Sequence, residues 1–318
     1  MSLSKLAFNY GVASDVGTVR DSNQDSAFAG KNFLLVADGM GGHAGGDVAS
    51  TITVTMLSPL DAAANPRGIA RNRLTEKEAI SLVERSVVQI YLAIIEAVKE
   101  NDELAGMGTT LTAILRSENA FVCAHLGDSR AYLLHEGKLT QITRDHTFVQ
   151  HLVDSGKITL EEAMTHPQKN VVMRVLGDFE VDLNPDIKSL PIERGDRYLL
   201  CSDGVCGVLD NDEIERILQN TVDVNEAAKK LVDRAMETGS TDNCTAVVAD
   251  VVSEKELPNH QDVPIFAGAA HESLQDYLNE IVERGKRAAI NTEPHVTKSS
   301  KRSLFSFFKK RNYNDDKS

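Results

Sequence analysis

Apolar runs that end at an aspartate constrain this chain more than any other feature of its sequence. The run at residues 33–37 stops at Asp38, and the run at residues 197–201 is followed closely by Asp203. Short apolar runs bounded by turn residues are typical of buried β-strands. Carboxylates carried on the ends of rigid strands can hold hard divalent cations such as Mg²⁺ and Mn²⁺, which prefer oxygen ligands.

Five short motifs share this acidic character. A single Asp-Gly pair is more often just a turn, but several such motifs together indicate a common site. Arg20 belongs to the set and suggests a bound anion, most simply a phosphate, because a planar guanidinium can donate two parallel hydrogen bonds to it. The glycines after Asp38 have no side chains, so a main-chain carbonyl there can also approach an ion. The motifs are RDSNQD at residues 20–25, DGMGGH at 38–43, GDSR at 127–130, SDG at 202–204 and DN at 242–243.

The order of the expected elements predicts an α+β fold. Short connections between the strands favour antiparallel pairing, and the long helix begins with a capping box formed by Thr75 and Glu78. We therefore predict two stacked antiparallel sheets flanked by helices, an α-β-β-α sandwich. The expected strands are 33–37, 108–115, 119–126, 131–134, 139–143, 197–201 and 245–252, and the expected helices are 47–57, 75–98, 212–219 and 224–238, with a helical flap at 147–170.

The pattern divides the chain into three parts. Residues 1–252 form the predicted catalytic domain, residues 253–270 a linker, and residues 271–318 a C-terminal extension with one amphipathic helix over 272–288. The extension ends in a basic-aromatic tail, residues 298–311, with six basic residues, no acidic residue and three phenylalanines. Three readings of this tail stay open: a solvated disordered segment, a peripheral anchor on anionic lipid, or a docking or phosphorylation segment.

The overall charge and the cysteines limit which partners and which cellular compartment we expect. A formal net charge of −13 argues against general nucleic-acid binding, because phosphate backbones repel an acidic surface. The four cysteines form no CxxC pair and suggest buried, reduced thiols. Without a signal-peptide pattern or a run of about 20 apolar residues, we expect a cytoplasmic monomer. Peripheral contact at the inner membrane face is one of the three open readings of the tail.

The ordered motifs over residues 8–252 resemble the metal-dependent serine/threonine protein phosphatases of the PPM or protein phosphatase 2C type, bacterial members above all. The resemblance implies two Mn²⁺ or Mg²⁺ ions, with a third, weaker ion at the position of Asp128. Asp38 would bridge the two ions, Arg20 would hold the substrate phosphate, and His43 would act as general acid. The implied metal ligands are Asp25, Asp38, Gly39, Asp128, Asp203 and Asp242.

The implied reaction is hydrolysis of phosphoserine and phosphothreonine in proteins by a metal-activated water. The implied partners are an autophosphorylated serine/threonine kinase and its substrates. Gln24 departs from the family pattern, which often has Glu there, and should tune metal affinity. His43 could instead cap the following helix, and Ser129 and Arg130 fit turn and strand-packing roles better than ligand roles.

The sequence lacks two motifs that would indicate other phosphate chemistry. Six residues separate Cys123 from Arg130, where a cysteine phosphatase needs five. The glycine-rich loop at residues 39–46 lacks the Lys-Ser/Thr of a nucleotide P-loop. Two alternatives stay open: a non-catalytic PPM-fold regulator that binds phosphoproteins, and a two-metal hydrolase of another phosphoester.

Overall fold

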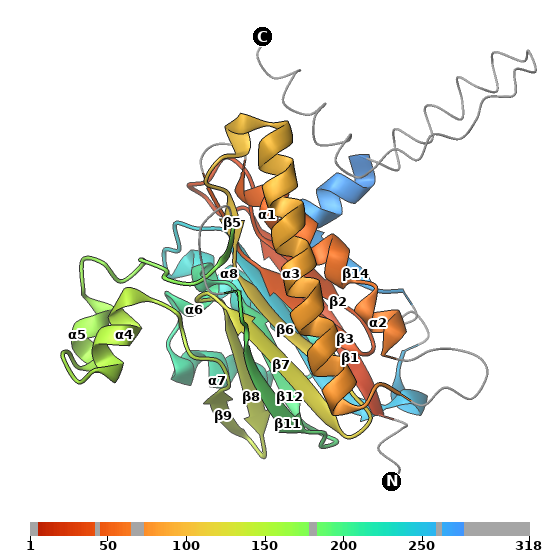
Figure 1. Ribbon diagram of the computed structural model, residues 1–318. Coiled ribbons are helices and arrows are strands. Elements are labelled where there is room, and N and C mark those ends of the chain that lie inside the picture. The colour runs from red at the N-terminus through yellow and green to blue at the C-terminus, as the bar shows by residue number, and fades with distance from the viewer. Residues whose placement is uncertain (1–5, 42–44, 65–72, 178–182, 259–262, 277–318) are drawn as a thin grey trace, which may run out of the picture.

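Two antiparallel sheets, one of six strands and one of five, stack face to face in the computed structural model of this chain (Figure 1). The structure describes residues 6–41, 45–64, 73–177, 183–258 and 263–276. Helices cover the outer face of each sheet. The predicted α+β sandwich of two antiparallel sheets flanked by helices is therefore confirmed.

Every strand pair in the described residues is antiparallel, and a small third sheet lies beside the two large ones. The six-stranded sheet has the order β11 (Asp186–Pro191), β7 (Ala120–Leu126), β6 (Leu111–Arg116), β3 (Phe33–Ala37), β2 (Ser26–Ala29) and β14 (Ile265–Gly268). The five-stranded sheet has the order β1 (Leu6–Asp15), β13 (Cys244–Ser253), β12 (Arg197–Cys201), β8 (Arg130–His135) and β9 (Lys138–Gln141). The small sheet contains β10 (Leu176–Gly177), β5 (Gly108–Thr109) and β4 (Gly39–Met40).

Three apolar layers hold the sandwich together. Between the sheets, the ring of Phe8 stacks on Phe121 at 4.7 Å and meets Tyr198 edge to face at 6.1 Å. One outer layer lies under α1 and α3, and the other lies under α6, α7 and α8. The helices are α1 (Gly46–Leu57), α2 (Leu60–Ala63), α3 (Glu76–Glu100), α4 (Phe148–Asp154), α5 (Leu160–Met164), α6 (Asp203–Cys206), α7 (Asn211–Asn220) and α8 (Val224–Glu237), with 3-10 turns η2 (Asp102–Leu104) and η3 (Glu254–Glu256).

The start of α3 follows from its sequence. The Thr75 side chain accepts from the backbone N–H of Glu78, whose carboxylate accepts from the backbone of Thr75, so the predicted capping box is present. The apolar residues of α3 then recur at helical spacing and are buried against the six-stranded sheet. In the predicted flap, Gly156 adopts φ +65° after α4 and before α5.

Six strands were not predicted from the sequence: β1, β2, β4, β10, β11 and β14. The short β2 has the sequence Ser-Ala-Phe-Ala, and alanine and serine carry little strand preference. The expected linker at 253–270 instead contains η3 and β14, which pairs with β2. The chain is helical over 269–276, while the rest of the predicted 272–288 helix and the tail lie outside the described residues.

No helix within the described part is long and apolar enough to cross a bilayer.

Candidate functional site

The ends of six strands bring the five predicted aspartates together at one edge of the sandwich. Ser26 pairs with Ala37, so Asp25 before β2 and Asp38 after β3 leave the same end of two neighbouring strands. The remaining members lie at corresponding ends: Asp203 opens α6 after β12, Asp242 precedes β13, and Asp128 lies between β7 and β8.

Burial and mutual repulsion act together on these carboxyls. Burial raises the pKa of Asp25 to about 7 and that of Asp128 to about 8, and nearby carboxylates add to both shifts. Burial also raises the pKa of Asp38 well above its usual range, and the charges of four other aspartates raise it further. So many buried like charges are costly without a counter-charge.

The donor set fits divalent cations. Carboxylate oxygens are the ligands that Mg²⁺ and Mn²⁺ prefer, and a cation would relieve the repulsion that raises these pKa values. A Cβ at Gly39 would lie 2.1 Å from the carbonyl oxygen of Gly46 and 2.5 Å from that of Gln24, so only glycine fits beside Asp38. The pattern of the sequence and the chemistry of the site therefore agree.

Threonine hydroxyls and amides fix the backbone of Asp38. The N–H of Asp38 donates to Thr110 Oγ1 at 2.9 Å, and the N–H of Thr110 donates to the Asp38 carbonyl at 2.8 Å. Thr109 Oγ1 donates to the same carbonyl at 2.9 Å. Ser129 is buried and its Oγ lies 2.8 Å from Thr110 Oγ1, which agrees with its expected structural role.

Two motif residues that were given no role from the sequence join the motifs to one another. Ser202 Oγ donates to Asp25 Oδ2 at 2.7 Å and accepts from the backbone N–H of Thr245 at 3.0 Å. Asn243 donates from Nδ2 to the carbonyls of Val16 and Ser22 and accepts from the N–H of Gln24. Their only sequence signal is that Ser202 and Asn243 are adjacent to predicted ligands.

Arg20 lies at the rim of the centre. Its Nη2 donates to Asp242 Oδ2 at 2.7 Å, and the two side chains are 51% and 38% exposed. A guanidinium at this place can receive an anion that arrives from solvent. His43, the predicted general acid, lies outside the described residues.

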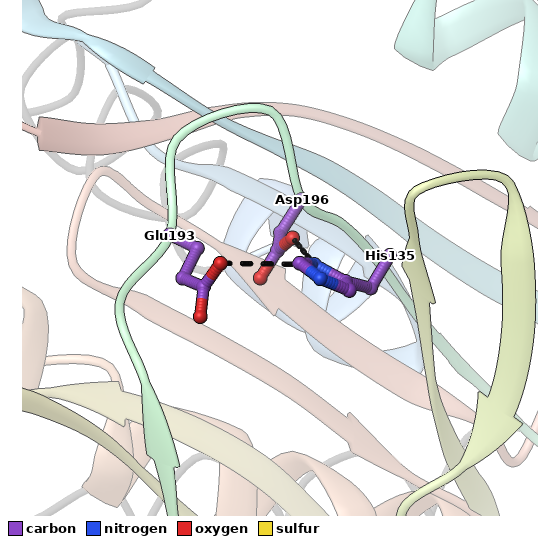
Figure 2. A group of neighbouring side chains, drawn as sticks. All are labelled: His135, Glu193 and Asp196. Atoms are coloured by element: carbon purple, nitrogen blue, oxygen red, sulfur yellow. Dashed lines mark hydrogen bonds and ion pairs between the residues drawn. The ribbon is translucent and has the colours of Figure 1, made fainter.

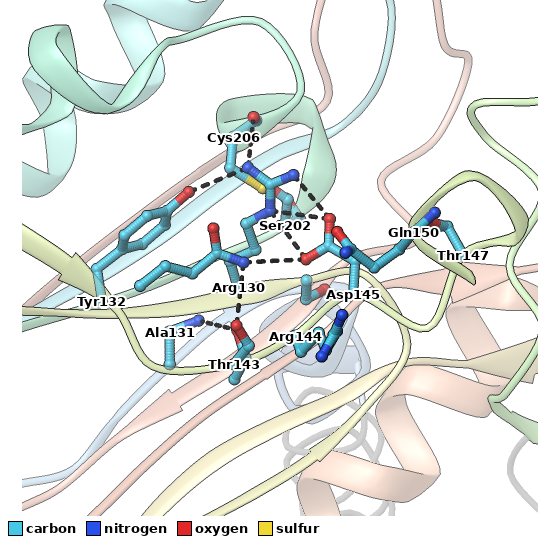
Figure 3. A network of polar contacts seen from close by, with 12 residues as sticks. Arg130, Ala131, Tyr132, Thr143, Arg144, Asp145, Thr147, Gln150, Ser202 and Cys206 are labelled. Atoms are coloured by element: carbon cyan, nitrogen blue, oxygen red, sulfur yellow. Dashed lines mark hydrogen bonds and ion pairs between the residues drawn. The ribbon is translucent and has the colours of Figure 1, made fainter. Parts of the chain in front are cut away.

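Arg130 ties the base of the predicted flap to the five-stranded sheet (Figure 3). Its Nε donates to both oxygens of Asp145 at 3.0 Å, and its Nη2 donates to Asp145 Oδ2 at 2.7 Å. Its Nη1 donates to Tyr132 Oη at 3.2 Å and to the Cys206 carbonyl at the end of α6 at 3.4 Å. The predicted packing role of Arg130 fits this network.

A separate acidic cluster with a histidine lies at the other end of β8 (Figure 2). The ligand atoms of His135, Glu193 and Asp196 all lie within 4.8 Å of one another. His135 Nδ1 lies 2.7 Å from Asp196 Oδ1, and this hydrogen bond raises the pKa of His135. The cluster is an ion pair at the far end of the strand and is not part of the aspartate centre.

Comparisons with known proteins agree on one family. The sequence profile of protein phosphatase 2C matches residues 12–244. The chain is 41% identical over 298 residues to the serine/threonine protein phosphatase PstP of Mycobacterium tuberculosis, covering 94% of this chain and 55% of PstP. It is 35% identical over 241 residues to the serine/threonine phosphatase stp of Listeria monocytogenes, covering 74% of this chain and 93% of stp. The chain thus spans about half the length of PstP.

Solved structures show the same fold. The crystal structure of PstP/Ppp from Mycobacterium tuberculosis superposes with a TM-score of 0.71 at 44% identity, covering 77% of this chain and 99% of that one. The PstP catalytic domain, solved in complex with two manganese ions, gives a TM-score of 0.69 at 43% identity, covering 78% of this chain and all of that one.

Proposed function

This chain belongs to the protein phosphatase 2C family, and we propose that it hydrolyses phosphoserine and phosphothreonine in proteins in a Mn²⁺- or Mg²⁺-dependent reaction. The observation that carries the proposal is the convergence of five aspartates, four of them with raised pKa, on one edge of the sandwich. Carboxyls with raised pKa that gather in one place are typical of a functional site.

Each residue of the centre has a proposed role as a metal ligand. Asp38 would contact both ions. One ion would also be bound by the Gly39 carbonyl, Asp203 and Asp242, and the other ion by Asp25. Asp128 would contribute to a third, weaker ion. When bound, the ions would make water nucleophilic at neutral pH and neutralise charge that develops on the phosphoryl group.

The side chains at the rim would bind and orient the substrate. Arg20 would exchange its hydrogen bond with Asp242 for two parallel hydrogen bonds to the phosphate, which fixes the phosphorus relative to the carboxylates. His43 would give a proton to the departing serine or threonine oxygen. Thr110 and Ser202 would keep Asp38 and Asp25 in place during the reaction.

The partners follow from the proposed reaction. We infer that the substrates are phosphoproteins, among them a serine/threonine kinase and its targets, and that the enzyme acts as a monomer. Four free, buried cysteines suit a reducing cytoplasm. The six basic residues and three phenylalanines of residues 298–311 would suit peripheral contact with anionic lipid at the inner membrane face.

Turnover of a phosphothreonine peptide by chelator-stripped protein, titrated with Mn²⁺, tests the proposal. We expect activity that requires the ion and disappears in Asp242→Asn. Asp196→Asn, which removes a buried carboxylate from the far end of β8, controls for general loss of charge and should stay active. Peptide binding without turnover at any Mn²⁺ concentration would instead identify the non-catalytic regulator, and selective turnover of small phosphoesters would identify a metabolite hydrolase.

A further inference from the structure

The segment after the matched family region returns to the aspartate centre. The profile match ends at residue 244, whereas β14 (Ile265–Gly268) lies some twenty residues further along and pairs with β2 in the six-stranded sheet (Figure 1). Within this pair Gly268 lies opposite Ser26, the residue directly after Asp25. The C-terminal segment therefore reaches the backbone of a proposed metal ligand.

The contact with Asp25 is made by the backbone. The N–H of Ala269 donates to the Asp25 carbonyl at 2.8 Å, and the N–H of Ala270 donates to Ser26 Oγ at 3.1 Å. Gly268 has φ +66°, and a Cβ there would lie only 2.1 Å from the Asp25 carbonyl oxygen. Both the backbone conformation and the close approach thus require glycine at position 268.

Asp25 is held from two sides. The C-terminal segment fixes its main chain, while Ser202 Oγ binds its carboxylate at 2.7 Å. Asp25 is 1% exposed, so its carboxylate has little freedom to compensate for a displaced backbone. A shift of the Asp25 main chain would therefore move the carboxylate relative to Asp38.

The segment is docked by its own side chains. The ring of Phe266 meets Phe28 edge to face at 5.0 Å, and Ala270 is fully buried in the layer under α1 and α3. Tyr10 Oη donates to the Val263 carbonyl at 3.1 Å at the start of the segment. This packing holds residues 263–270 against the sheet independently of any ion.

We propose that residues 263–270 are a positioning element of the metal centre. Gly268 and Ala269 set the place of Asp25, so the affinity for divalent cations depends on this segment being docked on β2. This inference rests on the proposed metal-dependent function.

The test compares two glycines with the same backbone angle in the full-length protein. Gly268 and Gly156 have φ of +66° and +65°, but a Cβ at Gly156 meets nothing within 4 Å. Gly268→Ala should weaken Mn²⁺ binding to the chelator-stripped protein by about tenfold, the scale for residues that support a ligand, as measured by calorimetry. Gly156→Ala should leave that affinity unchanged.

A second variant, Phe266→Ala, separates an effect on Mn²⁺ affinity from an effect on stability. It removes packing from the segment, which should lower the melting temperature, but it leaves the Gly268 contact with Asp25 in place. A purely structural role predicts that both variants lower the melting temperature without changing Mn²⁺ affinity, and that result would overturn the proposal. Should Gly268→Ala not fold, hydrogen exchange of the Ala269 amide in the unaltered protein decides: Mn²⁺ should slow it, and an unchanged rate would overturn the proposal. If the unaltered protein binds no Mn²⁺ at all, the proposed function itself fails.

Discussion

Replacing Arg130 by alanine should lower the free energy of unfolding by about 3 kcal/mol, because it leaves the Asp145 carboxylate nearly buried without its partner. The Arg130 and Asp145 side chains are 27% and 11% exposed, and two guanidinium nitrogens, Nε and Nη2, make three hydrogen bonds to the two carboxylate oxygens. Removing one partner of a fully buried pair costs about 3–5 kcal/mol, and the partial exposure of Arg130 favours the lower end.

The assay is urea and thermal unfolding of the chelator-stripped protein, which keeps metal binding out of the comparison. For a domain of this size, about 3 kcal/mol corresponds to a fall in Tm of roughly 6–12 °C. Lys229→Ala serves as the control, since its pair with Asp233 is 69% and 43% exposed. Such a surface pair should contribute less than about 1 kcal/mol.

A double-mutant cycle with Asp145→Ala isolates the pair from other effects of each change. We expect the double variant to be clearly more stable than the sum of the two single losses predicts, by about 1.5 kcal/mol or more. Strict additivity, or a loss in Arg130→Ala no larger than in Lys229→Ala, would refute the reasoning that this network joins the flap to the sheet.

Three further predictions concern the centre, the far end of β8 and the tail. Asp38→Asn should lower turnover by more than ~100-fold yet keep or raise the Tm of the chelator-stripped protein. A neutral amide avoids both the burial of a charge and the repulsion by other aspartates that raise the pKa of this group. Normal turnover would remove Asp38 from the site. The raised pKa of His135 means that its bond with Asp196 stabilises the fold fully below the unfolded pKa near 6.5, and that this stabilisation is lost as the pH rises through the folded value. His135→Gln should therefore flatten the fall in Tm between pH 6 and 8, and an unchanged slope would contradict the assignment. Deleting residues 277–318 should leave hydrolysis of a small aryl phosphate unchanged, whereas a collapse in rate would place these residues in the catalytic unit.

Local patterns account for what the sequence predicted correctly. The capping box at Thr75 and the apolar run of β3 are complete within a few residues, so they can be recognised without knowing the fold. The short β14 could not be recognised in this way, because its four residues include a glycine and acquire strand geometry only against β2.

The same distinction applies to the site. The aspartates were identified because motifs and family resemblance mark them one by one. The supporting roles of Ser202 and Ala269 depend on which segments the fold brings to Asp25, across 177 residues in the case of Ser202. A side chain that acts on a distant residue, or a backbone amide that does so, leaves no pattern in the sequence.

The hydrogen bond between Arg20 and Asp242 has a consequence for the order in which ligands bind. This hydrogen bond already uses Nη2 of Arg20 and Oδ2 of Asp242, so each group would have to give up this contact to bind its proposed ligand with all of its polar atoms. A cation bound by Asp242 would release Arg20 and would thereby raise the affinity for a phosphorylated substrate. Because such coupling is reciprocal, the substrate must tighten the cation by the same factor. At low cation concentration, phosphoproteins would thus help to load the enzyme that dephosphorylates them.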